Sequence, residues 1–335
     1  MSPRVHRVTP SMAIEGGRLL VEGERLLTGS ELPTVSIAGR PARLARASSA
    51  MLVVTVPPGA ASGVQPVTVD GHADQAEFVE IGAPFVTGIH QVDNPVFDGK
   101  GQLYVTDSGS RGQQAPVSIF RVTRDGRRQP FVMGITNPTS LAVDRLGRLH
   151  VTSRFDGAVY RIDEEGGFTP VASELGIACG LVFDEDNVMY VGDRTGNIFR
   201  VEEGGRAQTL AALPPSVAAF HLALAPDGTL AATAPTLGSR DAVYRIDRDG
   251  HVDTLSLRFG RPQGLAFDPN GVLYVTEALA GRSGLYRVSG FAAAADGAEL
   301  ILSGANLIGV AFDPQGGLAV TTADTVYRLT GGARA

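Results

Sequence analysis

A carboxylate, a thiol and an imidazole occur at comparable points of this sequence, as Asp93, Cys179 and His221. A histidine within hydrogen-bond distance of a cysteine can activate the thiolate as a nucleophile, and Asp93 or Glu277 could orient the imidazole ring. The same three side chains could instead bind a soft divalent ion. A lone cysteine beside small residues is also typical of a buried core position, as is a histidine between phenylalanine and leucine. We predict Asp93, His221 and Cys179 as the catalytic group, with the core interpretation as its alternative.

The elements that must position these residues are repeats. A phrase of the form aliphatic–aromatic–Arg–aliphatic occupies residues 119–122, 159–162, 198–201, 243–246, 285–288 and 326–329. The copies recur about every 40 residues and each follows another apolar run, which in four of the six repeats comes after a turn of the Asp-x-x-Gly type. Four antiparallel strands in each such repeat form one blade of a propeller.

The two ends of the repeat region complement each other. The sixth repeat stops after its third strand, while residues 84–89 resemble residues 130–135, the fourth strand of the first repeat. Residues 84–89 are therefore expected to be the outer strand of blade six, which removes an open sheet edge. The predicted fold is all-β, with an immunoglobulin-like β-sandwich over residues 1–82 and a six-bladed β-propeller over residues 83–335.

Polar residues gather where the inner strands begin and in the loops between the second and third strands of the blades. In a propeller these positions lie on one face, around the mouth of the central channel, where concave sites form. The loops include Arg111 among other polar residues. The residues that we predict to bind a substrate there are Asn94, Thr139, Arg154, Arg194, Gln263 and Glu277.

The first 82 residues resemble an IPT/TIG domain, an immunoglobulin-like module. The matching positions include residues 15–17, 54–58 and 67–69, within short apolar runs separated by turn residues. Such modules usually act as spacers or contact surfaces. The resemblance therefore implies a protein-contact role for this segment and no chemistry.

The repeat region resembles the gluconolactonase/regucalcin and NHL-repeat propellers, on residues 93–98 and 264–276. Gluconolactonase-type members bind a divalent metal at the channel mouth through a Glu, two Asn and an Asp, a ligand set that suits Ca²⁺ or a similar hard ion. Asp93 stands at the first of these positions. Cys179, Phe220 and Gln263 stand at later ones, which makes a poor cage for a hard ion. The resemblance implies one divalent metal with Asp93 as a ligand.

The composition excludes several classes of function. A net charge of −6 provides no basic surface for nucleic acid, and the single cysteine allows no internal disulfide. The first residues contain no apolar run of the kind found in a signal peptide, and no stretch of 18 apolar residues occurs. We expect a cytoplasmic protein with neither a membrane nor a nucleic-acid partner.

These features favour a propeller that binds a small molecule at its channel mouth. If it is an enzyme, the resemblance implies a hydrolase or isomerase that acts on a lactone or ester. In that mechanism a metal or the pair Arg154 and Arg194 would polarise the carbonyl, and Asp93 or His221 would act as the base. The alternative is a non-catalytic, NHL-like scaffold that binds a protein partner through its loops and through the IPT/TIG-like domain.

Overall fold

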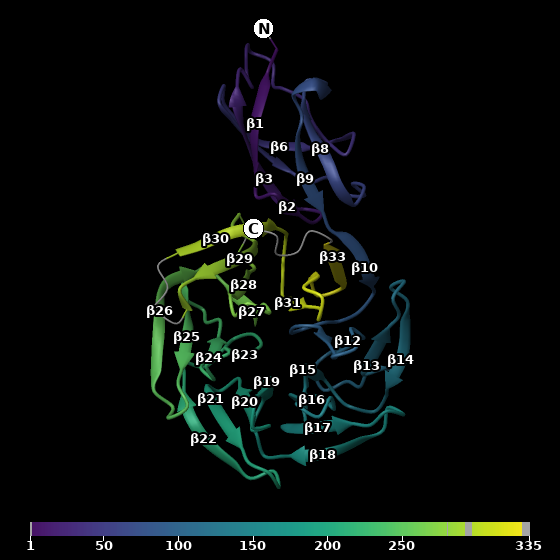
Figure 1. Ribbon diagram of the computed structural model, residues 1–335, viewed down its shortest axis with the longest axis vertical. Helices are drawn as coiled ribbons and strands as arrows, with labels where there is room; N and C mark the ends of the chain where they lie inside the picture. The colour runs from purple at the N-terminus through teal and green to yellow at the C-terminus, as the bar shows by residue number, and fades with distance from the viewer. Residues whose placement is uncertain (1, 280, 292–296, 330–335) are drawn as a thin grey trace.

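The computed structural model describes residues 2–279, 281–291 and 297–329, and it consists almost entirely of β-strands. Within these ranges the one helix is the short 3-10 turn η1 (Ala73–Gln75), and no helix has the length and apolar character needed to span a membrane. Figure 1 shows a small sandwich above a ring of sheets, which confirms the predicted all-β class. Residues 1 and 330–335, the ends of the two predicted domains, lie outside the described residues.

The N-terminal domain contains two packed sheets. The first has the order β1-β3-β7-β6, formed by β1 (Arg4–Thr9), β3 (Arg18–Glu24), β7 (Met51–Thr55) and β6 (Arg43–Ala47). The second contains β2 (Met12–Ala13), β9 (Glu77–Ile81), β8 (Gly63–Val69), β4 (Val35–Ile37) and β5 (Arg40–Pro41).

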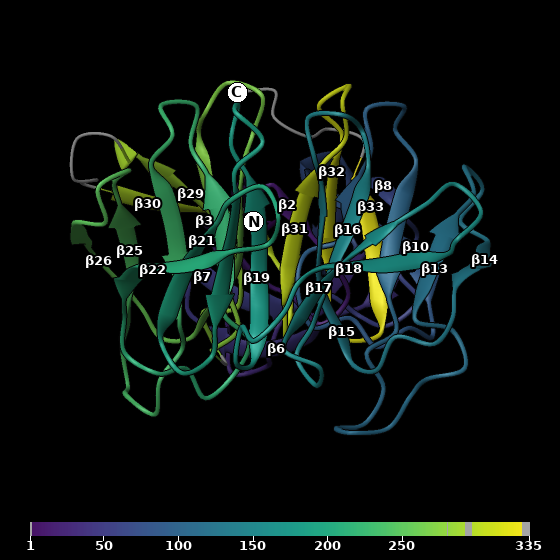
Figure 2. The same cartoon turned by 90° about the horizontal axis from the view of Figure 1, so that it is seen from below.

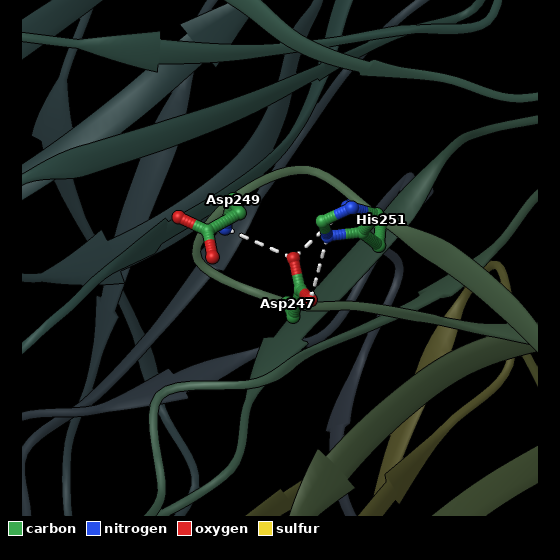
Figure 3. Close-up of side chains that lie close together, drawn as sticks. All are labelled: Asp247, Asp249 and His251. Atoms are coloured by element: carbon green, nitrogen blue, oxygen red, sulfur yellow. Dashed lines mark hydrogen bonds and ion pairs between the residues drawn. The ribbon is translucent and has the colours of Figure 1, made fainter.

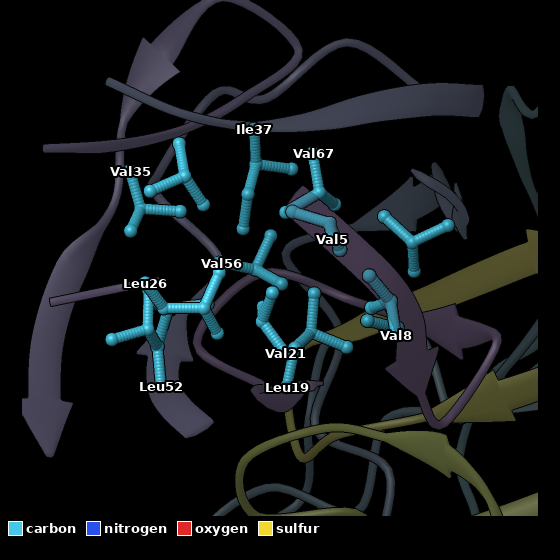
Figure 4. Packing of buried hydrophobic residues seen from close by; sticks show 14 of the residues in the cluster. Val5, Val8, Leu19, Val21, Leu26, Val35, Ile37, Leu52, Val56 and Val67 are labelled. Carbon is cyan, nitrogen blue, oxygen red and sulfur yellow. The ribbon is translucent and has the colours of Figure 1, made fainter. Parts of the chain in front are cut away.

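Alternating apolar residues of these strands form the core of the sandwich. Along β7, Leu52 and Val54 are fully buried while their neighbours are partly exposed, as expected for a strand with one face against a core. Figure 4 shows Leu52 among side chains from both sheets, including Leu19 and Ile37, and Val54 belongs to the same cluster. This domain therefore has its own hydrophobic core.

The repeat region forms six four-stranded blades, numbered one to six in chain order, of which blade five is part of a larger sheet. Each blade has the repeat phrase in its third strand, and its inner strand faces the centre of the ring (Figures 1 and 2). Blades one to three comprise β11 (Val96–Phe97), β12 (Leu103–Thr106), β13 (Ile119–Val122) and β14 (Arg128–Val132); β15 (Pro138–Val143), β16 (Leu149–Ser153), β17 (Ala158–Ile162) and β18 (Phe168–Ala172); and β19 (Ala178–Phe183), β20 (Met189–Asp193), β21 (Asn197–Val201) and β22 (Ala207–Ala212). Blades four to six comprise β23 (His221–Leu224), β24 (Leu230–Thr233), β25 (Asp241–Ile246) and β26 (Val252–Phe259); β27 (Pro262–Phe267), β28 (Leu273–Glu277), β29 (Gly284–Ser289) and β30 (Gly297–Ser303); and β31 (Gly309–Phe312), β32 (Leu318–Thr321), β33 (Thr325–Leu329) and β10 (Ala83–Thr87).

The outer strand of blade six comes from the start of the repeat region. β10 pairs antiparallel with β33, with Pro84 opposite Tyr327 and Thr87 opposite Thr325. The first and last segments of the ring thus belong to one sheet. Inner strand β11 contacts β15 on one side and β31 on the other, so the first and sixth blades are neighbours.

The recurring aspartates stabilise the turns between inner and second strands. In blade two, Asp144 Oδ1 accepts hydrogen bonds at 2.9 Å from the backbone N–H groups of Leu146 and Arg148. The same pattern, with donors two and four residues later, occurs at Asp98, Asp184, Asp268 and Asp313. Aspartate recurs there because its side chain can replace a backbone acceptor in a tight turn.

The two domains are connected by hydrogen bonds as well as by the chain. Strand β2 lies between β9 and β30 and pairs in parallel with both, with Met12 opposite Glu80 on one side and Leu302 on the other. The second sheet of the sandwich therefore continues blade five as one sheet of nine strands. Ile14 is fully buried against residues of blades five and six, so the junction has apolar packing of its own.

Candidate functional site

The carboxylate of Asp93 connects three blades at the hub of the ring. It precedes the inner strand of blade one, and its Oδ1 lies 2.6 Å from Nδ1 of His221, at the start of the inner strand of blade four. Ser140 of blade two donates its hydroxyl to Oδ2, and the N–H of Asn94 donates to Oδ1 at 2.7 Å. The side chains of Asp93 and His221 are nearly fully buried, with exposed fractions of 6% and 0%.

His221 has the orientation of a general base. A carboxylate accepts hydrogen bonds, so Nδ1 donates to Asp93, and in the neutral ring Nε2 is then the acceptor atom. Nε2 is buried and has no hydrogen-bond partner. An unpartnered buried polar atom is uncommon and costs stability. The structure thus joins Asp93 and His221 as a dyad, and it buries that dyad beneath the mouth.

Cys179 lies nearby on β19, but its environment disfavours a thiolate. The side chain is 1% exposed, and burial raises the pKa of the thiol to about 12, with the charge of Asp93 acting in the same direction. A backbone hydrogen bond with Phe220 and the charges of Arg154 and Arg194 oppose this shift without reversing it. At neutral pH the thiol is protonated, so the geometry gives no support to Cys179 as a nucleophile.

The residues at the expected metal positions do not fit a metal ion. Asp93 already accepts three hydrogen bonds, Cys179 is a buried neutral thiol, and Phe220 offers no donor atom. Among the described residues, one group of three His, Cys, Asp or Glu side chains has its ligand atoms within 4.8 Å of one another, and it lies elsewhere. These side chains therefore do not form a metal site at the centre of the ring.

That group is Asp247, Asp249 and His251, in the exposed turn between β25 and β26 (Figure 3). Asp247 Oδ1 accepts the backbone N–H groups of Asp249 and His251, both at 2.9 Å, and Oδ2 lies 3.0 Å from His251 Nδ1. These are the hydrogen bonds of an aspartate-stabilised turn, so the cluster is explained by the local backbone.

Two of the predicted substrate-binding residues are part of the scaffold. Asn94 donates from Nδ2 to the carbonyl of Leu265 and accepts from the N–H of Val310, both at 2.9 Å, which ties blade one to blades five and six. Thr139 is fully buried, and its hydroxyl donates to the carbonyl of Asn137 at 3.2 Å. Their polar atoms face protein groups.

The predicted residues of blade five are also buried. Glu277 is fully buried and accepts the backbone N–H groups of Gly260, Arg261 and Leu279 at 2.5, 2.7 and 2.9 Å, so its carboxylate anchors two loops. Gln263 is 7% exposed at the start of β27. Neither residue lines the pocket among the loops of blades one to three, which is described next.

Arg154 and Arg194, in contrast, line an open pocket together with Arg111. The pocket has a volume of about 350 Å³ and lies among the loops between second and third strands of blades one, two and three. Its other lining residues include Asn137, Phe155 and Ile177. Three guanidinium groups from three blades therefore face one space at the channel mouth.

The electrostatics of this pocket are unbalanced. Burial lowers the pKa of Arg154, and the neighbouring charges of Arg194 and Arg111 lower it further. Its Nε atom is buried without a hydrogen-bond partner. Within the part of the chain that the structure describes, none of the three arginines forms an ion pair, and no carboxylate lines the pocket.

Asn137 positions the blade-one loop and was not predicted from the sequence. It is fully buried with a φ of +48°, donates from Nδ2 to the carbonyls of Ser108 and Ser110 at 2.6 and 2.8 Å, and accepts the N–H of Gly112 at 2.7 Å. These bonds fix the loop that carries Arg111 against blade two. An asparagine directly before a proline was the available signal, because Asn tolerates a positive φ better than most residues.

Comparisons with known proteins agree with this architecture. Residues 3–79 match the IPT/TIG domain family. A Bacteroides thetaiotaomicron protein of unknown function has a similar structure over 98% of each chain, with 13% identity and a TM-score of 0.60. A protein whose proposed activity is that of a gluconolactonase matches over 74% of this chain and 90% of its own, with 16% identity and a TM-score of 0.59.

Virginiamycin B lyase from Staphylococcus aureus is also similar, over 73% of this chain and 94% of its own, with 13% identity and a TM-score of 0.53. At these identities the likeness concerns the fold. No curated protein matches the chain in sequence. Residues 3–79 thus match the IPT/TIG domain family, and the structural likeness supports a β-propeller fold for the region that follows.

Proposed function

We propose that the propeller binds a small molecule at the mouth of its channel, in the pocket above blades one to three. The observation that carries this proposal is the convergence of Arg111, Arg154 and Arg194 on one space of about 350 Å³. A pocket of this size suits a small ligand, and polar groups that converge on a concave site are typical of ligand recognition. The fold alone does not determine the ligand.

If the protein is an enzyme, hydrolysis of an ester or lactone is the reaction that these side chains suit. An arginine of the pocket would polarise the carbonyl oxygen, and His221, oriented by Asp93, would take a proton from the attacking water through Nε2. The 0% exposure of His221 opposes this mechanism, because the loops must first move to admit water. Binding is therefore the function that the geometry supports best.

A scaffold role for the sandwich is the second candidate, favoured by two large apolar side chains on its surface. Val64 is 67% exposed and Phe78 is 57% exposed, and both border a groove of about 390 Å³ between the sandwich and blades five and six. Adjacent exposed apolar residues at a groove often mark a contact surface. This surface lies apart from the arginine pocket, so the two roles are compatible.

The binding proposal is tested by a thermal-shift screen against neutral lactones, esters, carboxylates and phosphate esters, followed by hydrogen exchange on each hit. A ligand at the mouth is expected to protect the loops at residues 107–118, 153–157 and 193–196. Hits that protect only the groove beside Phe78 would support the scaffold surface instead. A screen in which no compound protects the three loops would refute the proposal.

A further inference from the structure

We propose that the ligand of this pocket carries an oxyanion, a carboxylate or phosphate group, which Arg111, Arg154 and Arg194 bind together. This inference rests on the proposed binding function and adds the chemical class of the ligand. A neutral sugar lactone, which the resemblance to gluconolactonases would imply, is then not the preferred ligand.

The first argument is that three arginines line one pocket with no carboxylate in its lining, whereas some arginines elsewhere in the chain have a carboxylate partner. Arg148 lies 2.6 Å from a carboxylate oxygen of Asp144, and Arg328 lies 2.7 Å from one of Asp313. The chain carries 35 acidic and 29 basic side chains of Lys and Arg, so acids are in excess. The lining of this pocket is therefore positively charged, although the chain as a whole is negatively charged.

The second argument is the state of Arg154 in the centre of this group. Its Nε–H is buried and makes no hydrogen bond, while burial and two neighbouring cations act against its charge. A buried donor without an acceptor and a charge without a counter-ion both cost stability. A bound oxyanion would supply the acceptor and the counter-ion at once.

The side chains also fit the geometry of such a ligand. Guanidinium groups donate two parallel hydrogen bonds to a carboxylate or phosphate. Arg194 extends toward the connection between blades three and four. Its Nε lies 3.4 Å from the carbonyl of Ser216 and its Nη2 lies 3.4 Å from that of Val217, which are long and weak contacts. Turning Arg194 toward an anion would therefore break only two weak hydrogen bonds.

The pocket favours a small, flat anion over a polymer. Phe155 is 60% exposed at the edge of the pocket and lies beside Gly112, so its ring can cover a planar part of a ligand. Three cations match a dianion, such as a dicarboxylate or a phosphate monoester. A nucleic acid would need a continuous basic surface, and the net charge of −6 disfavours one.

The test is isothermal titration of the full chain and of Arg111→Gln, Arg154→Gln and Arg194→Gln. The probes are inorganic phosphate, succinate, citrate, gluconolactone and a short single-stranded RNA. Arg43→Gln, at an exposed position of the sandwich, is the matched control. We expect a phosphate or carboxylate probe to bind, each pocket variant to bind about 10- to 100-fold more weakly, and the control to be unchanged. The phosphate and carboxylate probes distinguish the two sources of the oxyanion.

A second readout separates binding from a structural role. Without ligand, Arg154→Gln is expected to raise the melting temperature, because it removes a half-buried charge repelled by its neighbours, whereas loss of a structural side chain would lower it. Arg111 is exposed on its loop, so Arg111→Gln tests binding even if another variant fails to fold. If only gluconolactone binds and protects the mouth, the oxyanion inference fails and the binding function stands. If only the RNA binds, the small-anion inference is overturned, and if no probe binds, both proposals fail.

Discussion

Replacing Asp93 with alanine tests whether the hub is joined by one carboxylate. In the structure this carboxylate accepts hydrogen bonds from His221 Nδ1, the Ser140 hydroxyl and the Asn94 N–H. Alanine leaves three donors without an acceptor in a buried place. Each unsatisfied donor costs about 1–3 kcal/mol, and partial relaxation of the structure lowers the summed cost. We therefore expect the free energy of unfolding to fall by about 4 kcal/mol.

The measurement is urea unfolding at pH 7, followed by circular dichroism, with a thermal melt beside it. For a ring of this size a loss of about 4 kcal/mol corresponds to a melting temperature lower by about 10 °C. Ser140→Ala removes one donor and leaves the other two bonds, so its cost is expected to be about 1–2 kcal/mol. Asp93→Asn retains one acceptor oxygen and should fall between the two.

Certain results would refute this reasoning. If Asp93→Ala and Asp93→Asn both unfold within about 0.5 kcal/mol of the parent, the carboxylate does not join the blades, because such small effects are typical of unconstrained surface sites. Equal losses for Asp93→Ala and Ser140→Ala would likewise contradict the assignment of three bonds to one acceptor.

Three further predictions concern residues that do not line the arginine pocket. Burial raises the pKa of Cys179 to about 12 from 9.0, so above pH 9 only the unfolded chain loses the thiol proton. In urea unfolding, the free energy of unfolding of the parent should therefore fall by about 1.4 kcal/mol per pH unit relative to that of Cys179→Ala. Equal pH slopes for the two proteins would contradict this. Burial lowers the pKa of His150 below 6.5, although the charge of Asp144 acts in the opposite direction. As the pH falls through 6.5, the imidazole takes up a proton in the unfolded chain before it does so in the folded protein, so the folded parent becomes less stable. Thermal melts should therefore show an advantage of His150→Tyr that grows from pH 8 to pH 5, and a constant difference would argue against it. Gly264→Ala would place a methyl group 2.5 Å from a backbone carbonyl oxygen of blade six, so it should lower the urea midpoint strongly. Gly99 has open space around it, so Gly99→Ala should have little effect on the urea midpoint. Equal midpoints for the two variants would exclude the close approach at Gly264.

Much of the architecture could be predicted from the sequence because its causes are local. Alternating apolar residues specify strands, and an aspartate that bonds to the N–H groups two and four residues later specifies a turn. The phrase that recurs about every 40 residues therefore predicts blades, and the likeness of residues 84–89 to residues 130–135 predicts an outer strand, which the structure places beside β33. The IPT/TIG resemblance of the first 82 residues is confirmed by the family match over residues 3–79.

The candidate site could not be predicted fully from the sequence, because it depends on contacts between residues that are far apart in the chain. Asp93 and His221 are 128 residues apart in the chain and 2.6 Å apart in space. Glu277 resembled a mouth residue in the sequence, yet backbone N–H groups occupy its carboxylate.

The sequence by itself determined the strands, their turns and the number of repeats, because each is set by residues a few positions apart. Only the tertiary structure decided which polar side chains turn into the scaffold and which face the pocket. Loops from three blades place Arg111, Arg154 and Arg194 around one space, and β2 joins the sandwich to blade five. These arrangements follow from contacts between distant segments, where packing and burial choose among many positions that the local pattern leaves equivalent.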